Sequence, residues 1–301
     1  MSLKEKSPDS AINLRLNEPE LEALALLLPE HKKRAIKIED FSDLYGEGVA
    51  RDRQEIERLK AAFEVENKDN GPEFFDCMKR AKLFEAILAE RAELDNWLGE
   101  GAQTIVASEY DDIKNGVDLA IEFSTEGGFK HLALSVDVTT SRQVVAQKIE
   151  RIKEEILGGK LTTIKYFYSE DSNIRGQLMK VPRILIGAGI ATAKELAALW
   201  LKTKRPKDNQ EARQSLQALA LHRIQLQILE EIKAQLEYFI EFARENKKEE
   251  LISEYRKALT VISEILGQKL SEIKLSEEER QRVQNDPVYK AIAIETGKII
   301  Q

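Results

Sequence analysis

The fold is decided by the stretch GVDLAIEF at residues 116–123, the linker STEGGFK at residues 124–130 and the stretch HLALSVDVT at residues 131–139. Apolar residues recur at every second position on both sides of the polar linker, as in strands that bury one face. Gly127 and Gly128 suit a two-residue turn because both can adopt a positive φ. This segment therefore predicts a β-hairpin.

The turn determines which residues of the two predicted strands are opposed. Four opposed pairs are apolar: Val117 with Val138, Leu119 with Val136, Ile121 with Leu134, and Phe123 with Leu132. A shift of one residue would bring polar side chains onto this face, so the pattern supports the register. The same register places Asp118 opposite Asp137 on the other face, among mostly small side chains.

Asp118 and Asp137 form the first candidate site. Opposed residues of antiparallel strands have Cβ atoms about 4.5–5.5 Å apart, and like charges placed there destabilise a sheet. A cation between the carboxylates removes this repulsion, and oxygen-only ligands favour Mg²⁺ or Mn²⁺ over zinc. The alternative is two solvated carboxylates on an exposed sheet face. Helices predicted at both ends of the hairpin favour the metal site.

The hairpin belongs to a longer α/β pattern. Residues 73–98 predict a helix without glycine or proline, and Gly158-Gly159 ends a second helix that begins at Ser141. The predicted order is helix, three strands, helix, two strands and helix, over residues 73–98, 104–109, 116–123, 131–139, 141–157, 163–168, 181–186 and 192–201. Such an order predicts an α/β core with a mixed sheet.

Changes in composition divide the 301 residues into three predicted segments. Residues 1–72 predict short helices, residues 73–207 the α/β core, and residues 208–301 a helical region. In the last segment we expect one long helix over 208–246 and a second over 249–273. Apolar residues of the second alternate in spacings of three and four, as in a coiled-coil seam. This predicts either a helical hairpin beside the core or an arm that forms a homodimer.

With Asp118 in GVDLAIEF and Asp137 in LSVDVTT, residues 73–201 resemble the PD-(D/E)XK nuclease superfamily, which has the restriction-endonuclease-like fold. The resemblance implies an αβββαβ core in which Asp118 on the second strand and Asp137 on the third bind a metal ion. A glutamate of the first helix often completes such a site. Glu85 in KLFEAIL fits because its apolar neighbours place it on the core-facing side of the helix, and Glu90 is the alternative.

The lysine of the family motif is displaced in this chain. The third strand usually carries a lysine two residues after its acidic residue, and Thr139 stands there instead. Some members supply the lysine from the following helix, where Lys148 lies one to two turns in. The other interpretation of Lys148 is a surface lysine on an amphipathic helix. Without a working lysine, the same fold would bind nucleic acid or a protein partner and not cut.

The resemblance implies hydrolysis of phosphodiester bonds in nucleic acid, with DNA as the expected substrate. A Mg²⁺ or Mn²⁺ ion held by Asp118, Asp137 and Glu85 would lower the pKa of a bound water and polarise the phosphate. Lys148 would orient the water or offset the developing charge. The predicted catalytic set is therefore Glu85, Asp118, Asp137 and Lys148.

Three weaker signals complete the pattern. Asp111-Asp112 either holds a second ion or forms a turn before the strand. Gly187-Ala-Gly189 lies between a strand and a helix, as in a phosphate loop, but lacks the rest of any nucleotide-binding motif, so a tight turn is expected. His31, His131 and His222 are scattered and match no metal-binding spacing.

The net charge of −7 is a sum of unlike parts. Residues 73–140 contain 14 acidic and 6 basic residues, whereas residues 141–207 contain 6 acidic and 14 basic ones. The acidic block holds the predicted metal ligands and the basic block flanks them, so only a protein that coats nucleic acid over its whole surface is excluded. The single cysteine excludes an internal disulfide and a Cys-rich zinc site. No membrane span and no secretory signal is visible, and a cytoplasmic location is expected.

Overall fold

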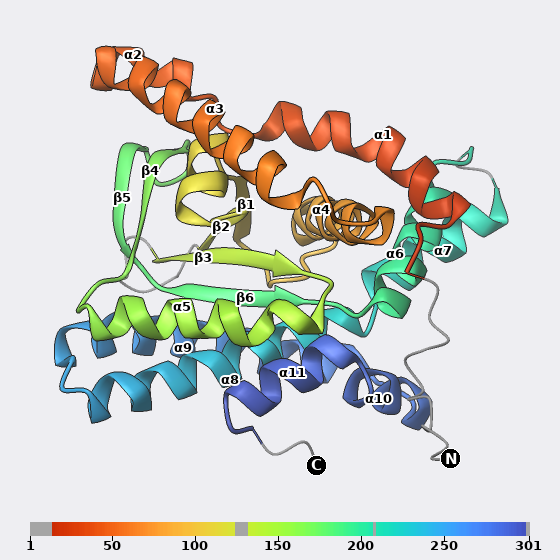
Figure 1. Ribbon diagram of the computed structural model, residues 1–301. Coiled ribbons are helices and arrows are strands. Elements are labelled where there is room, and N and C mark those ends of the chain that lie inside the picture. The colour runs from red at the N-terminus through yellow and green to blue at the C-terminus, as the bar shows by residue number, and fades with distance from the viewer. Residues whose placement is uncertain (1–13, 124–131, 207–208, 299–301) are drawn as a thin grey trace, which may run out of the picture.

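A four-stranded mixed sheet lies at the centre of the computed structural model, which describes residues 14–123, 132–206 and 209–298 (Figure 1). Its strands follow the order β1-β2-β3-β6; β2 is antiparallel to β1 and β3, and β6 is parallel to β3. β4 and β5 form a separate antiparallel pair. The strands are β1 (Ala102–Val106), β2 (Leu119–Phe123), β3 (Leu132–Thr139), β4 (Thr162–Ser169), β5 (Ile174–Val181) and β6 (Arg183–Gly187). The predicted α/β class with a mixed sheet is confirmed.

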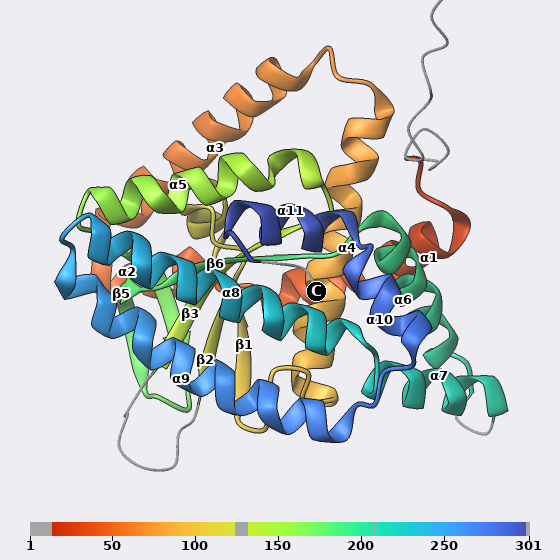
Figure 2. The same ribbon diagram turned by 90° about the horizontal axis from the view of Figure 1, so that it is seen from below.

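Helices enclose the sheet. Figure 1 shows α1 and α3 above the sheet and α5, α8 and α9 below it, and Figure 2 shows the lower layer from underneath. The helices are α1 (Glu18–Arg34), α2 (Ser42–Tyr45), α3 (Glu47–Asn67), α4 (Pro72–Leu94), α5 (Val145–Leu157), α6 (Ile190–Thr203), α7 (Gln210–Ala220), α8 (Ile224–Glu245), α9 (Glu249–Glu272), α10 (Glu277–Gln284) and α11 (Pro287–Glu295), with short helical turns η2 (Ile38–Phe41), η3 (Asp111–Asn115) and η4 (Arg142–Val144). Within the described residues, no helix has both the length and the apolar character that crossing a membrane requires.

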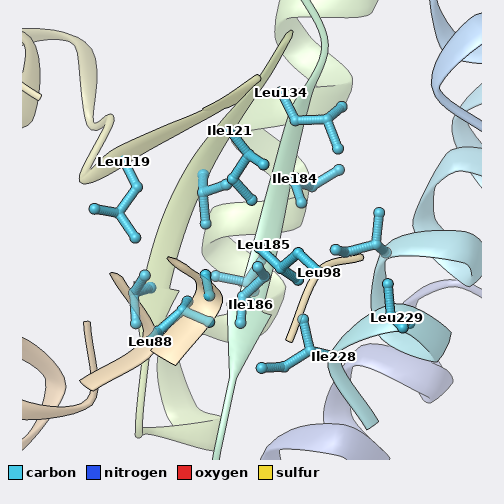
Figure 3. Close-up of a cluster of buried hydrophobic side chains, with 14 of the residues drawn as sticks. Leu88, Leu98, Leu119, Ile121, Leu134, Ile184, Leu185, Ile186, Ile228 and Leu229 are labelled. Carbon is cyan, nitrogen blue, oxygen red and sulfur yellow. The ribbon is translucent and has the colours of Figure 1, made fainter. Parts of the chain in front are cut away.

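β2 and β3 pair in the predicted register. Leu119 lies opposite Val136, Ile121 opposite Leu134, and Phe123 opposite Leu132. These side chains belong to the main apolar cluster, in which Figure 3 shows Leu119, Ile121 and Leu134 near β6 and side chains of α4 and α8. Alternation of apolar residues was therefore a sufficient guide to the pairing. The predicted turn at Gly127-Gly128 lies outside the described residues.

The opposite face of the sheet is covered by β4 and β5, and β5 was not predicted. Ala120 and Ala133 pack there against Ile164 and Phe167 of β4. Most side chains of β5 are exposed or half-buried, so its sequence lacks the alternation that marks a strand. The last predicted strand, 181–186, corresponds to β6, which begins two residues later.

The C-terminal region contains one break more than predicted. The single helix expected over residues 208–246 is two helices, α7 and α8, because the chain turns at His222-Arg223. There Nδ1 of His222 accepts the N–H of Ile224 at 3.2 Å, and Arg223 forms an ion pair with Glu195 of α6 at 2.6 Å. The helix predicted over residues 249–273 is confirmed as α9.

α8 and α9 form a hairpin that packs beside the core. The apolar seam of α9 is largely buried within the chain, with Ile252, Tyr255 and Ile262 at most 2% exposed. Of the two sequence interpretations, this is the hairpin beside the core, and a homodimer would have to use other faces of these helices.

The main apolar cluster includes residues of α1, α4 and α8. The division into domains at residues 72 and 207 stays a prediction.

A tight turn was expected at Gly187-Ala-Gly189; in the structure these residues are the end of β6 and a short connection to α6, and a carboxylate of the chain itself lies at the start of α6. The N–H of Gly189 and the hydroxyl of Thr192 donate to Asp286 Oδ2 at 2.8 and 2.9 Å. A Cβ on Gly187 would lie 2.1 Å from Cγ1 of Val288. Glycine is therefore required for the close approach of α11, and Asp286 takes the place that an anion would have in a phosphate loop.

Side chains of α8 close the free edge of β6. Gln235 donates to the carbonyl of Leu185 at 2.7 Å and accepts the N–H of the same residue at 2.8 Å. One turn earlier, Glu231 accepts the N–H of Gly187 at 3.0 Å, and Gln227 donates to the Gly187 carbonyl at 3.1 Å. Main-chain groups that another strand would bond are thus satisfied by a helix.

Glu231 makes stability depend on pH. Burial raises its pKa well above the ordinary 4.5, so the folded chain retains a proton that the unfolded chain has lost. The free energy of unfolding should therefore fall as pH rises above about 4.5, by up to ~1.4 kcal/mol per pH unit from this group alone. Glu231→Gln removes this contribution. We expect the variant to gain stability relative to wild type between pH 5 and 7.5 in urea titrations.

The matched control is Glu237→Gln, which changes an exposed carboxylate of the same helix that pairs with Lys233. The difference in the free energy of unfolding between Glu237→Gln and wild type should be the same at pH 5 and at pH 7.5. A difference between Glu231→Gln and wild type that is the same at pH 5 and pH 7.5 would contradict the prediction.

Candidate active site

Asp118 lies immediately before β2, where the regular pairing with β3 ends at Leu119 and Val136. Its Oδ2 accepts the main-chain N–H of Val138 at 2.7 Å, and its Oδ1 accepts from Nζ of Lys82 at 2.9 Å. The sequence predicted a directly opposed Asp118–Asp137 pair. The direct opposition is not found, because the N–H of Asp118 donates to the carbonyl of Val136, the partner of Leu119, at 2.9 Å.

Asp137, on β3, is bound by Lys148 of α5. The Lys148 ammonium forms an ion pair with Asp137 and donates to the carbonyl of Val138 at 3.2 Å. Burial raises the pKa of Asp137 to about 6, even though Lys148 acts in the opposite direction. Thr139, at the usual position of the motif lysine, accepts the N–H of Ser141 at 3.1 Å and shapes the turn that leads to α5.

Glu85, on α4, is linked to Asp118 by Lys82, which contacts both carboxylates. The Lys82 ammonium lies 2.8 Å from Glu85 Oε2, 2.9 Å from Asp112 Oδ2 and 2.9 Å from Asp118 Oδ1. Three carboxylates from α4, η3 and the start of β2 therefore surround one ammonium group. Because Lys82 and Glu85 are three residues apart, they share a face of the helix.

Glu90, the alternative to Glu85, points elsewhere. Its carboxylate accepts the indole N–H of Trp200 and pairs with Lys204 at 3.2 Å, both on or next to α6. Glu90 therefore joins α4 to α6, and Glu85 is the glutamate of this helix that reaches Asp118.

α1 contributes a histidine to the site. Nε2 of His31 lies 2.9 Å from Glu85 Oε1, and both side chains are at least 95% buried. α1 is held against α4 by Arg80 and Glu20, which are fully buried and paired at 2.5 Å. The Arg80 guanidinium also donates to the carbonyls of Leu14 and Arg15. The N-terminal helices thus form part of the site.

The charges of these groups follow from burial and from one another. Burial and the negative charge of Asp118 raise the pKa of Glu85 to about 8. Burial also acts to raise the pKa of Asp118, but Lys82 and Lys148 outweigh it and the pKa is lowered. Burial and Lys82 lower the pKa of His31 to about 4, so this imidazole is neutral at pH 7. Asp118 is therefore the carboxylate that Lys82 and Lys148 hold in its charged form.

The predicted site residues line one hollow. A cavity of about 280 Å³ is bordered by all four of them, Glu85, Asp118, Asp137 and Lys148. A second hollow, of about 880 Å³, lies between α1, α3 and the end of β1. The two share Lys82, Glu85, Asp112 and Asp118 in their walls. These residues therefore lie where the two hollows adjoin.

The donor chemistry suits a hard cation, but an ammonium group lies among the donors. Across residues 14–123, 132–206 and 209–298, no group of three or more His, Cys, Asp or Glu side chains is arranged so that it could hold a metal ion. Glu85, Asp112 and Asp118 instead converge on Nζ of Lys82 within 2.9 Å. Mg²⁺ and Mn²⁺ bind such oxygen ligands. The donor types therefore suit a divalent ion, whereas the arrangement around Nζ of Lys82 is that of an ammonium site.

Lys82 and His31 were not assigned to the site from the sequence, and Asp111-Asp112 was expected either to hold a second ion or to form a turn. The three-residue spacing of Lys82 and Glu85 could have indicated Lys82. His31 lies 54 residues before Glu85, and no sequence pattern connects the two. Asp112 contacts Lys82, while Asp111 has the structural role of a turn residue. Asp111 is fully buried and accepts the main-chain N–H groups of Lys165 and Tyr166.

Comparison of the chain with protein-family models, with curated proteins and with solved structures gave no match.

Proposed function

We propose that this chain is a metal-dependent nuclease that hydrolyses phosphodiester bonds in DNA. The observation that carries the proposal is the meeting of Glu85, Asp118, Asp137 and Lys148 at one hollow. If the separate pair β4–β5, which lies between α5 and β6 in the chain, is left out, the order α4-β1-β2-β3-α5-β6 agrees with the αβββαβ core that the resemblance to the PD-(D/E)XK superfamily implies. The single cysteine agrees with a reducing, cytoplasmic location.

Each residue has a role that follows from its position. Asp118, Asp137 and Glu85 would hold a Mg²⁺ or Mn²⁺ ion, which when bound supplies Lewis acidity and an activated water. Lys148 replaces the strand lysine and would stabilise negative charge that develops on the phosphate. Arg151, exposed one turn further along α5, donates to the carbonyl of Asn115 beside this hollow and would contact the DNA backbone.

Cleavage assays with the purified full chain test the proposal. Linear duplex, branched and single-stranded DNA are incubated with Mg²⁺, with Mn²⁺ or with a chelator. We expect ion-dependent cleavage, reduced about a hundredfold or more by Asp137→Asn and by Lys148→Met. Lys153→Met is the control because Lys153 lies on the same helix but pairs with exposed Glu150. No cleavage of any substrate, or equal cleavage by Asp137→Asn, would overturn the proposal.

A second function is favoured by Thr139 and by the position of Lys82. With no lysine on the third strand and an ammonium among the carboxylates, the fold would bind nucleic acid without cutting it. The same preparations distinguish the two. Binding that weakens steeply with salt, together with intact DNA, supports the binding module, and ion-dependent cleavage excludes it.

A further inference from the structure

Lys82 is coordinated in the way a bound cation is. An ammonium group has three N–H donors, and Lys82 has three carboxylate acceptors at 2.8–2.9 Å, on Glu85, Asp112 and Asp118. Its hydrogen-bonding capacity is therefore used up by the acidic cluster. These acceptors come from three different elements, so their convergence results from the tertiary fold and not from helix spacing alone.

Two of the three carboxylates are also held by groups other than Lys82. Glu85 Oε1 lies 2.9 Å from Nε2 of His31, and Asp118 Oδ2 accepts the N–H of Val138 at 2.7 Å. The neighbouring Lys148 is engaged with Asp137 and Val138. Glu85 and Asp118 would therefore keep their places when the ammonium leaves, and their oxygen atoms are the ligands that Mg²⁺ and Mn²⁺ bind.

Lys82 has space into which it can withdraw. Its side chain is 38% exposed, unlike that of Glu85 at 3%. It borders both the smaller hollow and the larger one of about 880 Å³. The flexible four-carbon stem can therefore carry the ammonium away from the carboxylates while its helix stays in place.

We propose that Lys82 is an internal cation that occupies the position of the divalent ion and must leave before that ion binds. The inference rests on the proposed metal site and adds a regulatory step to it. With Lys82 in place the carboxylates are held in position without metal. Divalent ions then bind only to the fraction of molecules in which Lys82 has withdrawn.

Mn²⁺ binding to the full chain, followed by the electron spin resonance signal of free Mn²⁺, tests this inference. If Lys82 occupies the cluster for about nine-tenths of the time, its removal should tighten Mn²⁺ binding about tenfold. We expect this for Lys82→Met and for Lys82→Gln, the second variant retaining polarity without charge. Lys79→Met, an exposed lysine of the same helix, should bind Mn²⁺ as wild type does.

Thermal unfolding gives an independent measure. Without metal, the Lys82 variants should melt below wild type because Glu85, Asp112 and Asp118 then lose the ammonium donor that they share. With saturating Mn²⁺, their melting temperature should rise by more than that of wild type. A decrease that Mn²⁺ does not reverse would identify Lys82 as a permanent structural counterion and overturn the inference.

The outcomes separate the two proposals. Equal Mn²⁺ affinity of wild type and Lys82→Met overturns the role of Lys82 and leaves the nuclease proposal standing. Binding by the Lys82 variants alone supports the role of Lys82 and argues against a metal-dependent wild type. Absence of binding in every variant overturns both.

Discussion

Replacing Asp118 with asparagine is expected to abolish Mn²⁺ binding and to slow DNA cleavage about a thousandfold. The carboxylate lies between Lys82 and the N–H of Val138, at the centre of the proposed metal site. The amide oxygen of asparagine can still accept from Val138, so the end of the sheet should keep its shape. What is lost is the charge that binds the ion, whose electrostatic effect on the transition state is worth several kcal/mol.

Two measurements check this prediction: single-turnover cleavage and Mn²⁺ titration, with circular dichroism to confirm folding. Asp69→Asn is the matched control because Asp69 is exposed in the turn between α3 and α4. It should retain full activity. A folded Asp118→Asn protein that cleaves DNA within tenfold of the wild-type rate would show that the ion, if required, is held elsewhere.

Replacing Glu20 with alanine is expected to lower the free energy of unfolding by about 3–5 kcal/mol. Arg80 and Glu20 are both 0% exposed and pair at 2.5 Å. The remaining partners of the Arg80 guanidinium are the carbonyls of Leu14 and Arg15, which are neutral. Among residues 14–123, 132–206 and 209–298, removing Glu20 therefore takes away the carboxylate that pairs with this buried cation between α1 and α4.

Urea unfolding of Glu20→Ala, with Glu22→Ala as control, tests the size of this effect. Glu22 lies on the same helix and is exposed, so its replacement should change stability by less than about 0.5 kcal/mol. Since α1 also carries His31, loosening it should raise the solvent exposure of Glu85. A loss below about 1 kcal/mol for Glu20→Ala would show that solvent reaches Arg80 in solution.

Local patterns predicted the parts of the structure that depend on neighbouring residues. The β2–β3 register followed from alternation because each slip would expose apolar side chains. The same register predicted Asp118 and Asp137 as neighbours, whereas Glu85 was added from the family resemblance and from its place on the core-facing side of its helix. β5 was missed because most of its side chains face solvent, and the break at His222-Arg223 depends on Glu195, a residue of another helix.

The groups that modify the site could not be predicted, since they come from tertiary packing. His31 reaches Glu85 because a buried ion pair fixes α1 against α4. Lys82 enters the carboxylate cluster because η3 brings Asp112 next to Asp118. The spacing of Lys82 and Glu85 indicates only that the two share a helix face, and no spacing indicates the approach of His31 or of Asp112. The metal-binding role assigned to Asp118 and Asp137 stays a prediction.

Because side chains of α8 satisfy the edge of β6, that edge stays open during part of the synthesis of the chain. The side chains that satisfy Leu185 and Gly187 follow them by 40–50 residues. At ~5–20 residues per second, the ribosome completes that interval in about 2–10 s. Until Gln227 and Gln235 emerge, a nascent chain carries an open strand edge that can pair with another chain. The nascent chain is therefore most prone to pair with another chain before its synthesis is complete. This risk ends when α8 has been made and packs on the edge of β6.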